Sequence, residues 1–316
     1  MIGKIEPRGG GALRLLTRSD FDGLACAALL KELGIIDTWK FVHPKDLQDG
    51  IIEVTDQDVL ANVPYVPGAH LWFDHHSSES ERLGDAADFG GESRLADSAA
   101  RVIYEYYGGK ARLPHMADMV AAVDKVDSAK LTREEILQPT GWVLLGFLMD
   151  PRTGLGRFRE FRISNYALME KLIEAVRVDS IDQILADADV AERVELYFAQ
   201  DALFRDMLAK HTRTQGNAII TDLRGVAPIY TGNRFLIYSL YPQQNISLWV
   251  VDGRERKNCP IAVGHSVLNR TSKTDVGSLM LRYGGGGHPQ VGTCQVPYAN
   301  ADRVIGELLD QINRDG

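Results

Sequence analysis

The sequence ALRLLTRSDFDGLACAALLKELG, residues 12–34, decides the fold class. Its first seven residues, up to Arg18, predict a buried strand; SDFDG predicts a turn; and LACAALLKELG predicts a helix that Gly34 ends. Further strands are predicted at 39–43, 51–55 and 69–73, and further helices from near Asp97 and over 114–129. Strands that alternate with helices predict an α/β domain with a mainly parallel sheet and flanking helices.

The second half of the chain changes character twice. Apolar residues recur at helical spacing from about 163 to 213, and strand-like runs follow from 216 onward. Those runs are 217–223, 226–232, 235–241, 246–252 and 260–268, and helices are predicted over 276–283 and 300–314. We therefore expect two domains, 1–190 and a smaller α/β domain over 215–316, joined by a helical linker over 191–214.

The composition is that of a soluble globular protein, with 45% hydrophobic and 25% charged residues. No apolar run has the length of a membrane span, and the N-terminus MIGKIEPRGGG lacks the features of a signal peptide, so we expect a cytoplasmic protein. The net charge of −8 argues against long duplex nucleic acid as a partner. A small phosphorylated substrate is compatible with it, because bound metal ions reverse the local charge. The three separated cysteines favour neither a disulfide framework nor a zinc–thiolate site.

Acidic residues follow three of the predicted strands. The carboxyl ends of parallel strands meet at one edge of a sheet, so these side chains are expected to gather there. Crowded carboxylates repel one another, and a divalent cation is the usual remedy. The residues are Asp20 and Asp22 after the first strand, Asp56 or Asp58 after another, and Asp74, His75 and His76 after 69–73.

Carboxylate and imidazole groups together suit manganese, iron or zinc, whereas magnesium takes imidazole less readily. Two such ions could activate water and hold a phosphoryl oxygen. A simpler interpretation exists for the first pair, because an aspartate before a helix is often its N-cap, and Asp22 before Gly23 fits that role. Paired histidines after an apolar strand have no routine capping role, so the combination of strand ends favours a metal centre.

Three motifs together resemble those of the DHH phosphoesterase superfamily, in the branch with a DHH-associated C-terminal domain. They are SDFDG (19–23), FDHHSS (73–78) and GGGGH (284–288), and their order and spacing agree over nearly the whole chain. That branch includes oligoribonucleases, 3′-phosphoadenosine 5′-phosphate phosphatases, cyclic-dinucleotide phosphodiesterases and proteins called exopolyphosphatase-related. The resemblance implies a catalytic metal-binding domain over 1–190 and a substrate-binding domain over 215–316, facing each other across a cleft. Family members are often dimers, so a homodimer is a further expectation.

The resemblance also implies a centre of two Mn2+ or Mg2+ ions. His76 and Asp74 are the expected catalytic residues, with His76 donating to the leaving group or orienting a ligand. The family's second motif is an aspartate at the end of a strand, and Asp56 and Asp58 both fit it. The implied metal ligands are Asp20, Asp22, Asp74, His75, Asp56 or Asp58, and Asp124, with Asp127 as the alternative to Asp124.

Arg18 departs from the family, whose first motif usually begins with histidine. Arginine stays protonated and cannot ligate a metal, so one of the two metal sites is expected to be weak. Arg18 could contact a substrate phosphate bidentately or neutralise the crowded aspartates. A third outcome is that the protein has lost activity.

The segment GGGGHPQVGTC, residues 284–294, is the second candidate site. Four glycines weaken any helix or strand, and they suit a backbone that turns its N–H groups toward an anion. A surface hairpin is the alternative. The candidate substrate-binding residues are Gly285, Gly286, Gly287, His288 and Arg270. The arginine- and phenylalanine-containing stretch 152–162 is interpreted as a solvated loop and helix start and is left out of the candidate sites; a phosphate-guiding strip is the alternative.

These features favour phosphoester hydrolysis by a metal-activated water. The expected substrate is a very short single-stranded oligonucleotide, which implies exonuclease activity, a linear dinucleotide, or a nucleoside bisphosphate. The first alternative is an exopolyphosphatase or pyrophosphatase. The second, motivated by Arg18, is a catalytically impaired nucleotide-binding regulatory protein.

Overall fold

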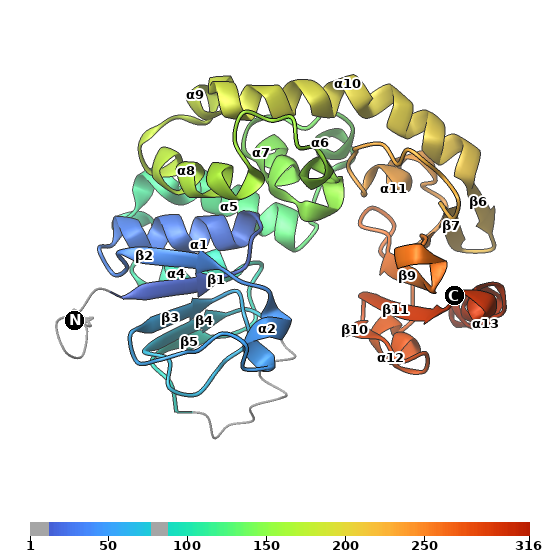
Figure 1. The fold of residues 1–316 in the computed structure, drawn as a ribbon, viewed down its shortest axis with the longest axis horizontal. Helices are drawn as coiled ribbons and strands as arrows, with labels where there is room; N and C mark the ends of the chain where they lie inside the picture. Colours follow the sequence, from blue (N-terminus) through green and yellow to red (C-terminus); the bar gives the residue numbers. More distant parts are fainter. Residues whose placement is uncertain (1–12, 77–87) are drawn as a thin grey trace. The chain divides into compact units, whose positions relative to one another are not determined.

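The computed structural model of the chain describes residues 13–76 and 88–316 (Figure 1). The chain divides into two compact units. Unit 1 comprises the residues up to Lys130 together with Pro139–Glu195, and unit 2 comprises Leu131–Gln138 and Leu196–Gly316. The boundary between Glu195 and Leu196 falls inside the long helix α10 (Ala188–His211). Among the described residues, no helix combines the length and the apolar character needed to cross a membrane.

A five-stranded parallel sheet forms the core of unit 1. Its strand order is β2-β1-β3-β4-β5, and all four neighbouring pairs run parallel. The prediction of an α/β fold with a mainly parallel sheet is therefore confirmed. The strands are β1 (Arg14–Thr17), β2 (Thr38–Phe41), β3 (Asp58–Ala61), β4 (Leu71–Asp74) and β5 (Gly91–Ser93).

Both faces of this sheet are covered. Helices α1 and α4 contact strands of one face and pack against each other and against α5 (Figure 1). On the other face, Leu16, Leu60 and Trp72 form a row across β1, β3 and β4, and Leu47 of α2 packs on that row. Burial on both sides explains why Leu15 and Leu16, which point to opposite faces of β1, are both apolar and fully buried. These helices are α1 (Phe21–Glu32), α2 (Pro44–Gln48), α4 (Ala99–Tyr106) and α5 (Ala117–Asp127).

The predicted strand at 51–55 is wrong, because β3 begins only at Asp58. Residues 51–57 form a loop, and its Ile52 and Val54 pack against the buried row of Leu16, Leu60 and Trp72. Their alternating apolar character therefore serves the core without a strand. Strand β5 and helix α7 (Gly141–Met149) were not predicted.

The remaining helical segments of unit 1 are η2 (Gly109–Ala111), η3 (Pro114–Met116), η4 (Pro151–Thr153), η5 (Leu155–Arg157), α8 (Asn165–Val178) and α9 (Ile181–Ala186).

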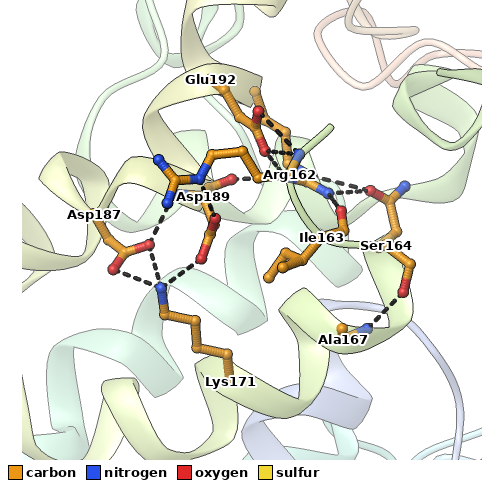
Figure 2. Close-up of polar contacts among 10 residues, drawn as sticks. Arg162, Ile163, Ser164, Ala167, Lys171, Asp187, Asp189 and Glu192 are labelled. Carbon is orange, nitrogen blue, oxygen red and sulfur yellow. Dashed lines mark hydrogen bonds and ion pairs between the residues drawn. The ribbon is translucent and has the colours of Figure 1, made fainter. Parts of the chain in front are cut away.

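Charged groups fasten the start of α10 to α8 and to the loop before α8 (Figure 2). Arg193 is fully buried, and its guanidinium donates to the carbonyl of Asp189 at 2.7 Å and to the carboxylate of Glu192 at 2.9 Å. Glu192 also accepts from the backbone N–H of Arg162 at 3.1 Å, and Asp189 contacts Lys171 Nζ at 2.7 Å. A buried charge is tolerated only with such partners. This part of α10 is thus held firmly within unit 1.

Unit 2 contains a six-stranded mixed sheet of order β10-β11-β9-β8-β7-β6, in which β7 and β8 run parallel and the other pairs antiparallel. Helices α12 (Val276–Leu281) and α13 (Ala301–Asp315) contribute to its core. The predicted amphipathic helix at 300–314 is confirmed, since α13 buries its apolar stripe. The strands are β6 (Thr212–Gln215), β7 (Ala218–Asp222), β8 (Ile246–Val250), β9 (Asn258–His265), β10 (Gly286–His288) and β11 (Val291–Pro297).

Two of the strands predicted for unit 2 are wrong. Residues 226–232 form no strand, and 235–241 contain the short helix α11 (Leu236–Leu240). A continuous apolar run such as FLIYSLY fits a buried helix as well as a buried strand, because it has no periodicity to separate them. Helix α6 (Arg133–Leu137) also belongs to unit 2, and the short helices η6 (Arg254–Arg256) and η7 (Tyr298–Asn300) complete it.

Candidate metal centre

The candidate centre lies at the carboxyl edge of the parallel sheet in unit 1. Thr17, Ala61 and Phe73 stand side by side in the register of β1, β3 and β4, so the residues that follow them leave the sheet at the same edge. The strand order reverses between β1 and β3, which is where open α/β sheets bind their ligands. The sequence-predicted residues can be placed relative to this edge.

Asp20 and Asp22 are held by the starts of two different helices. Helix α1 begins directly after Asp20, whose Oδ1 accepts from Gly23 N at 2.9 Å and caps the helix. Asp22 therefore lies in the first helical turn, and the capping role that the sequence suggested for Asp22 belongs to Asp20. Asp22 is 2% exposed, and its two oxygens accept from Ala99 N and Ala100 N at 2.9 and 2.8 Å, at the start of α4.

His75 points a buried nitrogen at carboxylates. Its Nδ1 lies 3.3 Å from the Ala96 carbonyl, which can only accept, so this contact requires the proton on Nδ1. Its Nε2 is buried and has no hydrogen-bond partner among the described residues, yet it lies 3.3 Å from Asp127 Oδ2 and 3.8 Å from Asp22 Oδ2. With its proton on Nδ1, the neutral ring presents an Nε2 lone pair to two carboxylates, and a cation between them would stabilise this arrangement. Histidines that ligate metals commonly donate their other ring N–H to a carbonyl in this way.

The spacing of these three residues fits one divalent cation. Asp22, His75 and Asp127 each offer one atom within 4.8 Å of the other two. Neighbouring ligands in an octahedral shell with metal–oxygen bonds of about 2.1 Å lie roughly 3 Å apart. Burial and the charges of Asp127 and Asp20 raise the pKa of Asp22 well above its usual range, because an ionised carboxylate here lacks a compensating charge. A bound cation would supply that charge.

The third residue of this group is Asp127, which the sequence analysis gave as the alternative to Asp124 as a metal ligand. The Asp124 carboxylate is turned toward α4, where it accepts from Ser98 Oγ at 2.7 Å and from Arg101 Nε at 2.8 Å. Asp127 is the last residue of α5 and approaches His75. Asp124 thus serves as an ion-pair partner between α4 and α5.

Asp74 lies at the end of β4, fully buried, and holds His76. Its Oδ2 accepts from His76 N at 3.1 Å, and its Oδ1 lies 3.0 Å from His76 Nδ1. Burial lowers the pKa of His76, but the hydrogen bond and charge of Asp74, with Asp127 and Asp22, outweigh it and raise that pKa above its ordinary value. The geometry gives Asp74 a positioning role beside the group of Asp22, His75 and Asp127. Ser77 and Ser78 of the FDHHSS motif lie outside the described residues.

Asp56 and Asp58 are not brought to this edge. Because β3 starts at Asp58, both residues lie at the amino end of the strand, and Asp58 accepts from Arg14 Nε at 2.7 Å. Asn62 follows β3 instead, where the resemblance implies an aspartate. Its Nδ2 donates to Asp20 Oδ1 at 3.0 Å, and its φ of 56° is one that asparagine tolerates. Correct placement of β3 would have identified Asn62 from the sequence.

Two arginines face the same group of acids. Arg18 is half-exposed, and its Nε lies 3.2 Å from Asp20 Oδ2. Arg152, from the stretch interpreted as a solvated loop, donates to Asp150 Oδ1 at 2.7 Å. Burial raises the pKa of Asp20 and Asp127 adds to this, whereas the charges of Arg18 and, more weakly, Arg152 oppose it. Sequence reasoning missed Arg152, because the stretch has no motif that distinguishes it.

In unit 2 the GGGGH segment forms a hairpin rather than a free loop. Its β10 pairs with β11, and the glycines permit close backbone contact. A Cβ on Gly285 would lie 2.0 Å from the carbonyl oxygen of Thr293, and Gly287 has a φ of 156°. Arg270 is exposed and its Nε donates to the Val267 carbonyl at 3.1 Å. Packing therefore explains Gly285 and Gly287. Substrate binding by Gly285, Gly286, Gly287, His288 and Arg270 stays a prediction.

Neither a family model nor a curated protein matches the chain. Solved structures do match it. PggH, a pGpG-specific phosphodiesterase from Vibrio cholerae, is 50% identical with a TM-score of 0.82, and the match covers 96% of this chain and 100% of that one.

Two further solved structures share the fold at low identity. The DHH domain of a member of the s1p family of ribosomal proteins is 11% identical, with a TM-score of 0.59 over 96% of this chain and 87% of that one. RecJ from Thermus thermophilus in complex with Mg2+ is 15% identical, with a TM-score of 0.50 over 98% of this chain and 50% of that one. These two show the fold alone.

Proposed function

Because the chain belongs to the DHH phosphoesterase superfamily, we propose that it is a divalent-metal-dependent phosphodiesterase whose substrate is a short linear dinucleotide of the pGpG type. The family supports a hydrolase that acts on phosphodiester bonds. The choice among the expected substrates rests on PggH, a pGpG-specific enzyme that is 50% identical over almost the whole chain.

The observation that carries the metal dependence is the buried Nε2 of His75. This atom makes no hydrogen bond among the described residues, and it faces the carboxylates of Asp22 and Asp127. An ion held there would lower the pKa of water and stabilise charge on the phosphoryl oxygens. The imidazole favours Mn2+ over Mg2+.

The residues around the ion would have separate roles. Ala99 N and Ala100 N, at the start of α4, hold the Asp22 carboxylate in place. Asp74 orients His76 and raises its pKa, so His76 would be the residue that donates a proton to the leaving oxygen. Gly285–His288 and Arg270 of unit 2 stay predicted phosphate-binding residues.

Hydrolysis by the purified full chain with Mn2+ tests this proposal. The substrates are pGpG, pApA, a longer oligoribonucleotide, 3′-phosphoadenosine 5′-phosphate and polyphosphate, and chromatography measures the products. We expect one water per pGpG to give two GMP, with slower cleavage of the others and loss of turnover after chelation. His75→Ala should abolish turnover, whereas Asp58→Asn, at the other end of the sheet, should retain it.

Three results would contradict the proposal. Cleavage of polyphosphate alone would move the protein to the exopolyphosphatase alternative. Turnover that survives complete chelation would remove the metal dependence. Tight binding of pGpG by a folded chain without hydrolysis at any Mn2+ concentration would favour the regulatory alternative.

A further inference from the structure

We infer that the centre takes one divalent cation per chain and that Arg18, fixed on Asp20 beside Asn62, binds the substrate phosphate in place of a second cation. The inference rests on the metal centre of the proposed function. It differs from the two-ion expectation in assigning the second position to the protein's own groups.

Donors already surround the Asp20 carboxylate. Its Oδ1 accepts from Gly23 N at 2.9 Å and from Asn62 Nδ2 at 3.0 Å. Its Oδ2 lies 3.2 Å from Arg18 Nε. A second cation on Asp20 would have to displace a charged partner or share the carboxylate with it. Asp20 therefore already has a cationic partner, whereas the donors to Asp22, Ala99 N and Ala100 N, are neutral backbone groups.

Asn62 weakens the same position for a metal. A carboxylate only accepts hydrogen bonds, so Asn62 must present its NH2 group to Asp20, and its amide adds no negative charge. The imidazole that the resemblance implies at the first motif is absent as well, because Arg18 stands there. Two of the expected donors for a second ion are thus a cation and a neutral amide.

The opposite side of the centre has the reverse balance. Asp22 and Asp127 are two anions that converge with the His75 Nε2. One divalent ion there matches two carboxylates. Arg18 adds one positive charge beside Asp20, and the charge of Arg152, which pairs with Asp150, also acts on Asp20 and Asp127.

Arg18 is placed to meet a phosphate. Its side chain is 48% exposed, so a substrate can reach it. The contact between Arg18 Nε and Asp20 holds the guanidinium group in a fixed orientation. Guanidinium groups bind phosphate oxygens through paired hydrogen bonds and remain charged at any working pH. Arg152 is more exposed still, at 58%, and is held by Asp150.

Manganese binding to the full chain tests the stoichiometry without reference to turnover. Equilibrium dialysis with elemental analysis should give one Mn2+ per chain, and electron paramagnetic resonance should show the hyperfine pattern of an isolated ion. Two ions per chain, or the spectrum of an exchange-coupled pair, would overturn the inference.

A variant designed to gain a second metal site tests whether Arg18 and Asn62 are what prevents binding of a second ion. Arg18→His combined with Asn62→Asp restores the imidazole and a carboxylate, and we expect this variant to bind a second Mn2+ ion. The control is Arg14→His, which breaks an arginine–aspartate pair with Asp58 at the other end of β1 and should leave one ion. If the folded double variant still binds one ion, the roles assigned to Arg18 and Asn62 are wrong.

Kinetics test the phosphate contact. Arg18→Met should raise the KM for pGpG and lower kcat/KM about 10- to 100-fold while Mn2+ stoichiometry stays at one. Arg18→Lys should recover part of the loss, and Arg14→Met should change neither constant. An unchanged KM in Arg18→Met would refute the contact. A chain that binds no Mn2+ refutes the proposed function itself, whereas two ions with full pGpG turnover refute only this inference.

Discussion

Asparagine substitutions at Asp127 and Asp124 should have opposite effects, although both residues lie in the last turns of α5. Asp127 faces the His75 Nε2, whereas Asp124 is bonded to Ser98 and Arg101 of α4. We expect Asp127→Asn to weaken Mn2+ binding and spare the fold. We expect Asp124→Asn to weaken the fold and spare Mn2+ binding.

The magnitudes follow from these contacts. Asp127→Asn removes one of three protein ligands and should weaken Mn2+ at least about 100-fold, since loss of an outer-shell partner alone costs 10- to 100-fold. The metal-free fold should change by no more than about 0.5 kcal/mol, because the side chain is partly exposed. Asp124→Asn removes the carboxylate charge from a partly buried ion pair with Arg101. This change should lower the free energy of unfolding by about 1–3 kcal/mol.

Urea unfolding with and without Mn2+ measures both effects. At a concentration of about 100 times its Kd, Mn2+ should stabilise the wild type by about 2.7 kcal/mol, and a 100-fold weaker variant by only about 0.4 kcal/mol. Asp124→Asn should keep the full Mn2+ increment from a lower baseline. An Mn2+ increment that is lost in Asp124→Asn and kept in Asp127→Asn would refute the assignment of Asp127.

Three shorter predictions concern other parts of unit 1. Gly23→Ala would place a Cβ 1.9 Å from the carbonyl oxygen of Arg18, so it should destabilise the fold by about 1–3 kcal/mol in urea unfolding and weaken Mn2+ binding in the same titration. Asp58→Asn should lower stability and leave Mn2+ affinity unchanged; a loss of Mn2+ would return this residue to the centre. The hydrogen bond from Lys171 lowers the pKa of Asp187, so that this carboxylate stabilises the fold above its unfolded pKa and loses the effect as pH falls through the lower folded value. Lys171→Met should therefore lower stability at neutral pH and flatten its decline below about pH 4, and an equally steep decline would contradict the pairing.

The strand-end pattern predicted two of the three residues that the structure brings together in the candidate centre. Asp22 and His75 were predicted, because β1 and β4 end in short motifs that no capping rule explains as a set. The N-cap alternative considered for Asp22 was nevertheless wrong, since α1 starts directly after Asp20, which caps the helix. Periodicity predicted that these residues lie at the carboxyl edge of the sheet. The orientation of the Asp22 side chain depends on α4, which is distant in the sequence.

The third strand shows where periodicity is insufficient. Val54 and its neighbours alternate with polar residues as a strand would, yet they pack as a loop on the face of the sheet. The true strand begins with Asp58, whose burial is tolerated because Arg14 of β1 pairs with it. That partner is visible only in the folded sheet. Because the strand was predicted at 51–55, Asn62 was not recognised as the residue that follows β3.

Arg18 and Asn62 have a different meaning together than separately. Arg18 by itself suggests a damaged metal site, because a cation replaces a ligand. Asn62 by itself suggests the loss of a metal-binding carboxylate. Both contact Asp20, one through charge at 3.2 Å and one through an amide N–H at 3.0 Å, so the remaining acid of this position is satisfied without a metal. Random decay of a site would leave Asp20 buried and uncompensated, which is costly. The paired contacts instead favour a centre whose charge is balanced for one cation and a substrate phosphate.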